Sequence, residues 1–195
     1  GPADAFVSPR SVEEVSQVVC ACEQASVPWR VIGSGSDLLV SDKGVEGVVI
    51  EVRDNLSAIR VDGTRIVAGA GATNAAVAEA ACAAGLSGYE FACGIPGPVG
   101  GAAIMNAGAY DGEFSQVCAC VTCVTPEGRI VEVPREEAEW SYRHSMFDAA
   151  RYVVVAATLE LTQADSADIR ARMDELAAKR EAKQPIDMPS AGSTF

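Results

Sequence analysis

The 195-residue sequence predicts a mixed fold of the α/β or α+β class, because helical and strand-like patterns alternate along it. Ser11 followed by Glu14 forms a capping box ahead of an apolar stripe with helical spacing, which predicts a helix start. Trp29–Ile32 and 48–52 are short apolar runs typical of buried strands, and the glycine-rich loop 33–36 follows the first run.

The middle of the chain predicts two β-hairpins, over residues 58–68 and 117–133. In each, apolar and β-branched runs flank turn-forming residues. The first turn is Asp62-Gly63, a strong two-residue hairpin signal. An alanine-rich helix capped by Thr73 is expected between the hairpins.

The C-terminal part predicts one strand and one helix. Residues 152–162 are rich in β-branched side chains and indicate a long strand. Residues 165–183 form a charged amphipathic pattern, in which Ile169, Met173 and Leu176 would face inward.

Charge and hydropathy exclude several classes of partner. The formal net charge of −12 argues against a nucleic-acid partner, because such proteins need a basic face. No apolar run approaches the roughly 20 residues that cross a bilayer, so no membrane span is predicted. A phosphorylated ligand would have to be held by backbone N–H groups and a few arginines, which directs attention to glycine-rich loops.

Seven cysteines, an odd number, predict free thiols in a cytoplasmic protein. Cys20 and Cys22 lie two apart in a helical pattern and point to nearly opposite sides. Cys118 and Cys120 share one face of a predicted strand, whereas Cys123 takes the other. Because these side chains do not converge, no metal site is predicted, and the thiols are expected to pack as small apolar groups.

Two glycine-rich segments are the candidates for ligand binding. Loop 33–39 lets successive N–H groups face a pyrophosphate, although its spacing is not Gly-x-Gly-x-x-Gly and a plain turn is the alternative. Segment 94–102 has four glycines and two prolines in nine residues, and 106–110 extends it; this density predicts neither helix nor strand over most of 94–110. Such a segment usually allows the main chain to approach a flat ligand or a phosphate. The candidates are Gly33, Ser34, Gly35, Ser36, Asp37, Leu38, Gly94, Ile95, Pro96, Gly97, Val99, Gly100, Gly101, Ala102, Asn106, Gly108 and Ala109.

These segments are followed by Tyr-Arg-His-Ser at 142–145 and Ser-Ala-Gly-Ser-Thr-Phe at 190–195. Together and in this order they resemble the UDP-N-acetylenolpyruvoylglucosamine reductases along the whole chain. The resemblance implies an α+β, two-lobed FAD-binding fold of the vanillyl-alcohol-oxidase/PCMH type, with lobes at 1–52 and 53–188. Residues 189–195 would begin a substrate-binding domain that is otherwise missing.

The resemblance also implies an activity. Noncovalently bound FAD, reduced by NADPH, would convert the UDP-sugar UDP-N-acetylglucosamine enolpyruvate to UDP-N-acetylmuramate in peptidoglycan synthesis. The family's second acid, a glutamate, has no counterpart here, so we expect this polypeptide alone to be inactive or nearly so. Two alternatives remain: a noncatalytic flavin- or nucleotide-binding module, and another flavin dehydrogenase or oxidase of the same fold.

Four residues are candidates for chemistry on the substrate. Ser193 matches the family's proton donor, which would protonate the carbanion or enolate left at C2; ending a turn is its alternative role. Arg143 matches the catalytic arginine, which would hold the substrate carboxylate, whereas a structural ion pair is the alternative. Tyr142 could contact flavin or substrate or simply pack, and Lys183 could reach the UDP diphosphate. His144 occupies the variable position of the motif and is given no role.

Two positions depart from the family pattern. Pro98 stands where Thr or Ser is usual, so the loop loses a hydroxyl and one N–H, a change that could weaken flavin binding. Asp37 stands where Asn is common and adds a negative charge near the expected pyrophosphate.

Overall fold

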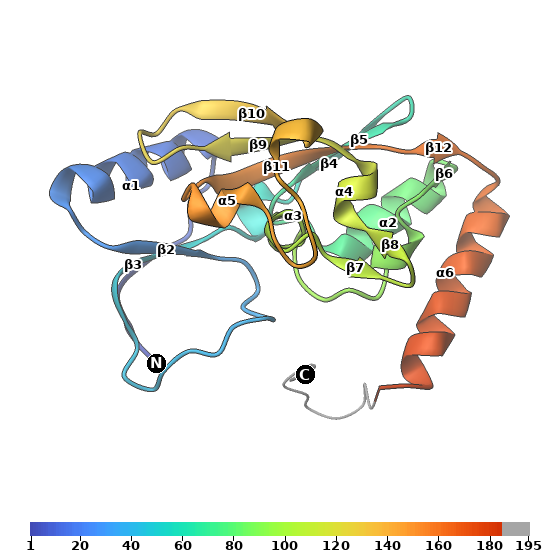
Figure 1. Cartoon of the computed structure of the whole chain (residues 1–195), viewed down its shortest axis with the longest axis horizontal. Coiled ribbons are helices and arrows are strands. Elements are labelled where there is room, and N and C mark those ends of the chain that lie inside the picture. The colour runs from blue at the N-terminus through green and yellow to red at the C-terminus, as the bar shows by residue number, and fades with distance from the viewer. Residues whose placement is uncertain (185–195) are drawn as a thin grey trace.

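The computed structural model describes residues 1–184, in which a three-stranded sheet, a five-stranded sheet, two short two-stranded sheets and the helices around them share one hydrophobic core (Figure 1). Ser193 and the predicted domain start at 189 lie outside the described residues. Among residues 1–184, no helix is long and apolar enough to cross a membrane.

The smaller sheet is three-stranded and parallel, in the order β1-β3-β2. Its strands are β1 (Ala3–Val7), β2 (Trp29–Ile32) and β3 (Val45–Glu51), and α1 (Val12–Ala25) connects β1 to β2. The Ser11 hydroxyl accepts a hydrogen bond from the Glu14 N–H at 3.3 Å, which confirms the predicted helix start. Strand β1 was not predicted, because it is a half-exposed edge strand without a clear alternation of apolar residues.

The larger sheet is five-stranded and antiparallel, in the order β10-β9-β11-β5-β4. Both predicted hairpins are present, as β4 (Ile59–Asp62) with β5 (Arg65–Gly69) and β9 (Cys118–Val124) with β10 (Ile130–Pro134). The predicted long strand is β11 (Val153–Glu160), which pairs with β9 on one side and β5 on the other. It therefore joins the two hairpins into one sheet.

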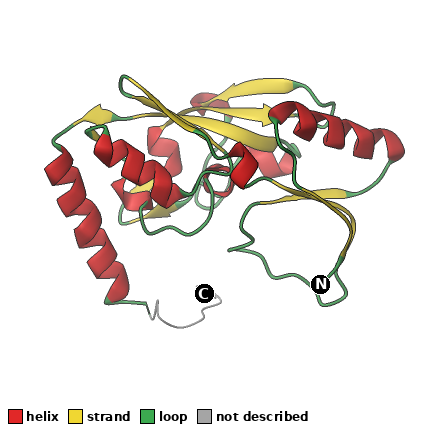
Figure 2. Ribbon diagram, turned by 180° about the vertical axis from the view of Figure 1, so that it is seen from behind, coloured by secondary structure: helices red, strands yellow, loops and turns green. Residues whose placement is uncertain are grey.

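The remaining helices cover the larger sheet and its end. Figures 1 and 2 show α2, α3, α4 and α5 beneath this sheet, with α6 at the far end from α1. The helices are α2 (Asn74–Ala83), α3 (Val99–Ile104), α4 (Phe114–Val117), α5 (Met146–Ala149) and α6 (Ser166–Glu181). The short strands are β6 (Leu86–Ser87), β7 (Gly108–Ala109), β8 (Gly112–Glu113) and β12 (Thr162–Gln163), and the 3-10 turns are Asp54–Leu56, Glu90–Ala92 and Arg135–Glu137.

Helix α3 lies inside the segment for which irregular backbone was expected. It begins directly after Pro98, and its glycine Gly100 is buried against the backbone and side chain of Ala70 at the end of β5. The low helix propensity of glycine is overridden here, because the absence of a side chain lets the helix backbone pack closely against Ala70.

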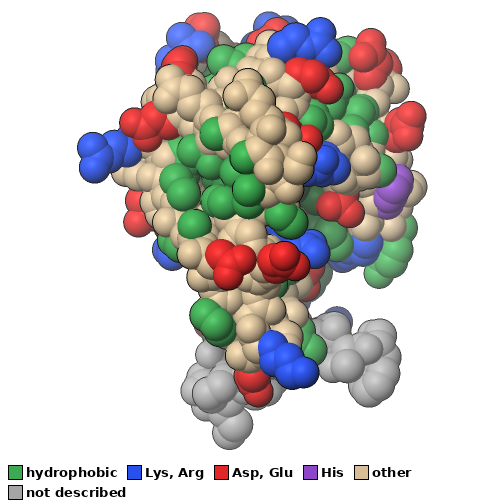
Figure 3. Space-filling view, turned by 90° about the vertical axis from the view of Figure 1, so that its left-hand side faces the viewer, with side chains coloured by type: hydrophobic (Ala, Val, Ile, Leu, Met, Phe, Trp, Pro, Cys, Tyr) green, Lys and Arg blue, Asp and Glu red, His purple; other side chains and the backbone are tan. Residues whose placement is uncertain are grey.

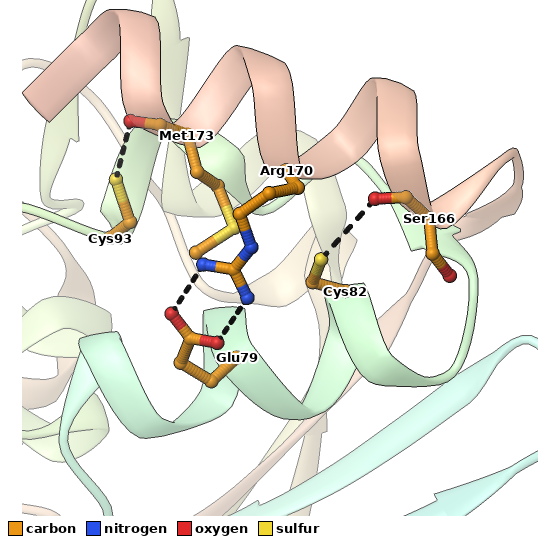
Figure 4. Close-up of polar contacts among 6 residues, drawn as sticks. All are labelled: Glu79, Cys82, Cys93, Ser166, Arg170 and Met173. Atoms are coloured by element: carbon orange, nitrogen blue, oxygen red, sulfur yellow. Dashed lines mark hydrogen bonds and ion pairs between the residues drawn. The ribbon is translucent and has the colours of Figure 1, made fainter.

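Helix α6 packs against α2, as Figure 4 shows. Arg170 donates to both carboxylate oxygens of Glu79 at 2.8 and 2.5 Å. The thiols of Cys82 and Cys93 point at backbone carbonyls of α6, at 3.6 and 3.9 Å. The predicted inward face is buried: Ile169, Met173 and Leu176. Because an exposed ion pair contributes only about 0–1 kcal/mol, the buried apolar face is what holds the helix in place.

We predict that Met173→Ala lowers the free energy of unfolding by about 2–4 kcal/mol, because the substitution leaves a cavity under α6. Arg172→Ala, on the exposed face of the same helix, is the control and should change stability by less than about 0.5 kcal/mol. Denaturant unfolding measures both values. Equal effects would show that the apolar face does not fix α6.

Candidate functional site

A cavity of about 440 Å³ lies where the two sheets meet, lined by residues from both. Nine predicted site residues line it: Gly33, Ser34, Gly35, Ser36, Asp37, Leu38, Gly100, Gly101 and Arg143. Other predicted residues are not part of the lining: Gly94, Ile95, Pro96, Gly97, Val99, Ala102, Asn106, Gly108, Ala109, Tyr142 and Lys183. The two glycine-rich segments, which lie far apart in the sequence, therefore meet at one site.

The two segments touch directly beside the cavity. A Cβ atom placed on Gly33 would lie 2.5 Å from Cγ of Pro98, and one placed on Gly97 would lie 2.9 Å from Oγ of Ser36. Gly97 also has a φ of +97°, which favours glycine on its own account. The absence of side chains at these positions is thus needed for the loops to pack together.

Other glycines differ in what lies over them. Among the described residues, no atom lies within 4 Å of a Cβ placed on Gly35 or Gly101, and both line the cavity. In contrast, a Cβ on Gly94 would lie 3.1 Å from Cδ of Arg180, and a Cβ on Gly108 would lie 2.7 Å from a neighbouring backbone oxygen. A flat ligand can therefore approach the backbone at Gly35 and Gly101, whereas protein atoms already cover the other two.

Two buried polar side chains, Tyr89 and Asn74, hold the backbone of segment 94–102 by hydrogen bonds and are called here the Tyr89–Asn74 relay. The Tyr89 hydroxyl donates to Oδ1 of Asn74 at 2.8 Å, and Nδ2 of Asn74 donates to the Gly97 carbonyl at 3.1 Å. Tyr89 and Asn74 are each 1% exposed, and burial raises the pKa of the phenol well above its usual range. The relay is therefore neutral and fixes the Gly97 peptide. No pattern in the sequence identified either residue.

Arg143 lies at the tip of a tight turn and extends along the cavity wall. Its guanidinium donates to the carbonyls of Asn106 at 3.3 Å and Gly108 at 3.1 Å, and lies 4.9 Å from the ring centroid of Tyr142. Three of the five guanidinium N–H groups have no hydrogen bond to described residues and could bind an anion. Tyr142 itself is 83% exposed, and Lys183 follows the end of α6.

The rest of the cavity wall is mainly apolar, which suits a flat aromatic ring. Sequence reasoning missed these residues: Val31, Ile32, Val52, Ala70, Ile104, Met105, Val153 and Val154. It also missed the polar groups Ser145, Asp148 and Tyr152. The apolar positions carry no signal of their own, since they look like any strand or helix interior.

Charge on the surface around α1 and the three-stranded sheet is mixed. In Figure 3, which faces this end of the molecule, Lys and Arg side chains are scattered among Asp and Glu around a patch of hydrophobic side chains. The sole histidine, His144, lines the cavity. With no broad basic surface on this face, an anionic ligand would have to rely on local N–H groups and on Arg143.

The cysteines are placed as packing residues. All seven are free thiols, and among residues 1–184 no cluster of three or more His, Cys, Asp or Glu could hold a metal ion. Burial raises the pKa of the Cys123 thiol to about 12 and also raises that of Cys118, so both stay protonated at neutral pH.

Comparison with known proteins defines the class first: residues 3–134 match the family described as FAD binding domain. The crystal structure of UDP-N-acetylenolpyruvylglucosamine reductase from Thermus caldophilus superposes with a TM-score of 0.84 at 33% identity, covering all of this chain and 68% of that one. The chain therefore belongs to the UDP-N-acetylenolpyruvoylglucosamine reductase family.

Sequence relatives agree with this family. The UDP-N-acetylenolpyruvoylglucosamine reductases of Clostridium novyi and Listeria welshimeri are 44% and 45% identical over 195 residues, and the chain spans 63% and 65% of their lengths. The glucose dehydrogenase Phl p 4.0202 shares only the fold, with a TM-score of 0.65 at 19% identity, as does 6-hydroxy-D-nicotine oxidase from Arthrobacter nicotinovorans, at 0.62 and 20%. The predicted α+β FAD-binding fold of the vanillyl-alcohol-oxidase/PCMH type is confirmed.

We predict that Gly33→Ala destabilises the chain by about 1–3 kcal/mol, because the new methyl group must displace the Pro98 ring. In the double variant Gly33→Ala/Pro98→Ala that ring is absent, so much of the loss should be recovered. Unfolding of the wild type, both single variants and the double variant gives the coupling energy. If the changes in unfolding free energy of the two single variants simply add in the double variant, Gly33 and Pro98 do not pack against each other.

Proposed function

We propose that this chain is the FAD-binding part of an NADPH-dependent enzyme of peptidoglycan synthesis. The reaction is reduction of UDP-N-acetylglucosamine enolpyruvate to UDP-N-acetylmuramate. The observation that carries the proposal is the meeting of loop 33–38 with Gly100 and Gly101 around one cavity. The names of the relatives supply the substrate class. The free thiols fit a cytoplasmic location, and the reaction needs neither a metal nor a nucleic-acid partner.

The residues present fit noncovalently bound FAD, because Gly35 and Gly101 leave backbone open to a flat ligand. When bound, FAD would supply hydride transfer from NADPH to the enolpyruvyl group. The cavity-lining residues of both glycine-rich segments would contact the cofactor. The candidates between Gly94 and Ala109 that do not line the cavity would instead fix the backbone conformation of the residues that do.

Two side chains are proposed to act on the substrate. Arg143 would direct its remaining N–H groups at the substrate carboxylate and stabilise the enolate as charge develops there. Ser193, which lies outside the described residues, would donate a proton to C2. Tyr142 and Lys183 are proposed to contact the UDP-sugar. In this scheme residues 1–52 and 53–188 are the two FAD-binding lobes, and 189–195 begin the substrate-binding domain.

We predict that Gly101→Ala separates cofactor binding from stability. Alanine in helix α3 should stabilise the chain by about 0.5–1 kcal/mol, because it replaces a flexible glycine at a position with free space. The same methyl group projects into the cavity, so affinity for FAD should fall about tenfold or more.

Gly94→Ala is the matched control for that experiment. Its methyl group would meet only the flexible stem of Arg180, so the Kd for FAD should stay within about threefold of the wild-type value. Fluorescence titration with FAD and denaturant unfolding measure the two properties. If both variants lose affinity for FAD equally, the proposal that FAD lies against the backbone at Gly101 is wrong.

The reductase activity is tested in a polypeptide that extends through the substrate-binding domain. We expect NADPH consumption that depends on the enolpyruvyl UDP-sugar. Ser193→Ala should lower that rate about 10²-fold or more while NADPH still reduces the flavin, because only the proton transfer is lost. A protein that binds FAD without substrate-dependent NADPH oxidation would instead be a noncatalytic module or a different flavin dehydrogenase.

A further inference from the structure

The turn that carries Arg143 is strained and needs outside support. Ser141 and His144 exchange backbone hydrogen bonds at 3.1 and 3.2 Å, which leaves Tyr142 and Arg143 at the tip. Arg143 has a φ of +55°, a left-handed conformation that costs a non-glycine residue about 1–2 kcal/mol. The contacts around the turn must offset this cost.

Side chains on both sides of the turn bind the end of helix α3. The Trp140 indole N–H donates to the Ala103 carbonyl at 2.8 Å, and the Ser145 hydroxyl donates to the Ile104 carbonyl at 2.6 Å. The Ala103 carbonyl also accepts from the Asn106 N–H at 3.5 Å, so the indole adds a second bond there. Carbonyls in the last turn of a helix have no partner within the helix, so the Ser145 hydroxyl satisfies an Ile104 carbonyl that would otherwise need water. Ser145 is 2% exposed, so its bond is shielded from solvent.

Asn106 makes the reverse contact, from the glycine-rich segment to the turn. Its Nδ2 donates to the Ser141 carbonyl at 3.2 Å, and its Oδ1 accepts from the Ser115 N–H at 2.9 Å. The residue is 1% exposed and has a φ of +40°, which asparagine tolerates better than most residues. Both ends of the amide are thus occupied by protein groups. The side chain links α3, the turn and the start of α4.

We propose that Asn106 and Ser145 are positioning residues, which fix the Tyr142–Arg143 turn to the end of α3 and so set where the guanidinium meets the cavity. This inference rests on the proposed function of Arg143. Neither residue needs to touch flavin or substrate. Asn106 and Ser145 join α3, which carries Gly101, to the turn that carries Arg143. The two sides of the cavity therefore form one rigid unit.

The variant Asn106→Asp tests this with minimal change in shape. It keeps the oxygen that accepts from Ser115 but loses the N–H that donates to the Ser141 carbonyl. In this chain, hydrogen exchange at the His144 amide should become about tenfold faster, because the turn has lost one hydrogen bond to a buried partner. The Kd for FAD should stay within about threefold of the wild-type value.

In the polypeptide that extends through the substrate-binding domain, Asn106→Asp should lower kcat for enolpyruvyl reduction about 10²-fold, since a misplaced guanidinium costs rate. Reduction of the flavin by NADPH should be unchanged. The loss should shrink as the pH falls, because a buried carboxyl that takes up a proton can again donate to Ser141. Ser145→Ala should also lower kcat for enolpyruvyl reduction and leave reduction of the flavin by NADPH unchanged. Its kcat should not recover as the pH falls, because alanine cannot take up a proton.

Asn55→Asp is the matched control. Its amide also donates to a backbone carbonyl, that of Pro9 at 3.3 Å, but at an exposed position in the Asp54–Leu56 turn. Asn55→Asp should change neither hydrogen exchange at the His144 amide nor kcat for enolpyruvyl reduction. The proposal is overturned if Asn106→Asp and Ser145→Ala leave the turn as protected as in the wild type, or if they abolish FAD binding along with catalysis. If the wild type reduces no enolpyruvyl substrate, the proposed function fails, while hydrogen exchange still decides whether Asn106 holds the turn.

Discussion

The site depends on a contact between two loops at which one partner has no side chain. Gly33, at the end of β2, lies against the Pro98 ring at the start of α3, and this contact closes one side of the cavity. Helix α1, beside the three-stranded sheet, makes a second contact with the larger sheet. There the Ser16 hydroxyl donates to the Gly128 carbonyl at 2.6 Å, and Cys20 fills the space where a side chain at Gly128 would lie. At each of these two contacts a glycine, Gly33 or Gly128, lets the neighbouring group approach closely.

Much of the fold follows from local signals in the sequence. Ser11 and Thr73 both cap the helices they were expected to start. The first predicted hairpin also forms, although its two loop residues are Gly63 and Thr64, one position later than expected, because Asp62 still pairs with Arg65. Such signals act through neighbours in the chain, so they can be read without knowledge of the tertiary structure. Helix α3 could not be found in this way. It forms because Gly100 packs against Ala70, a contact between residues 30 positions apart (100 − 70 = 30) that local propensity opposes.

The candidate site was predictable as a region but not residue by residue. Composition alone indicated that both glycine-rich segments approach a ligand, yet it treated every glycine alike. The structure separates Gly101, which faces open space, from Gly94, which lies under the stem of Arg180. That difference depends on where α6 docks, and nothing in the segment itself encodes it. The buried relay from Tyr89 through Asn74 was missed for the same reason, since hydrogen bonds between distant residues leave no local pattern.

A chain with a formal net charge of −12 that is proposed to bind two phosphorylated molecules must hold them with a small number of well-placed positive groups. Arg143 meets this demand because a guanidinium offers five N–H groups in one plane. Two of them bind the carbonyls of Asn106 and Gly108, and the others are available to an anion. Lysine has a single ammonium group on a flexible stem and cannot hold two carbonyls and a carboxylate in one fixed plane. The geometry therefore favours arginine at this position for structural reasons as well as chemical ones.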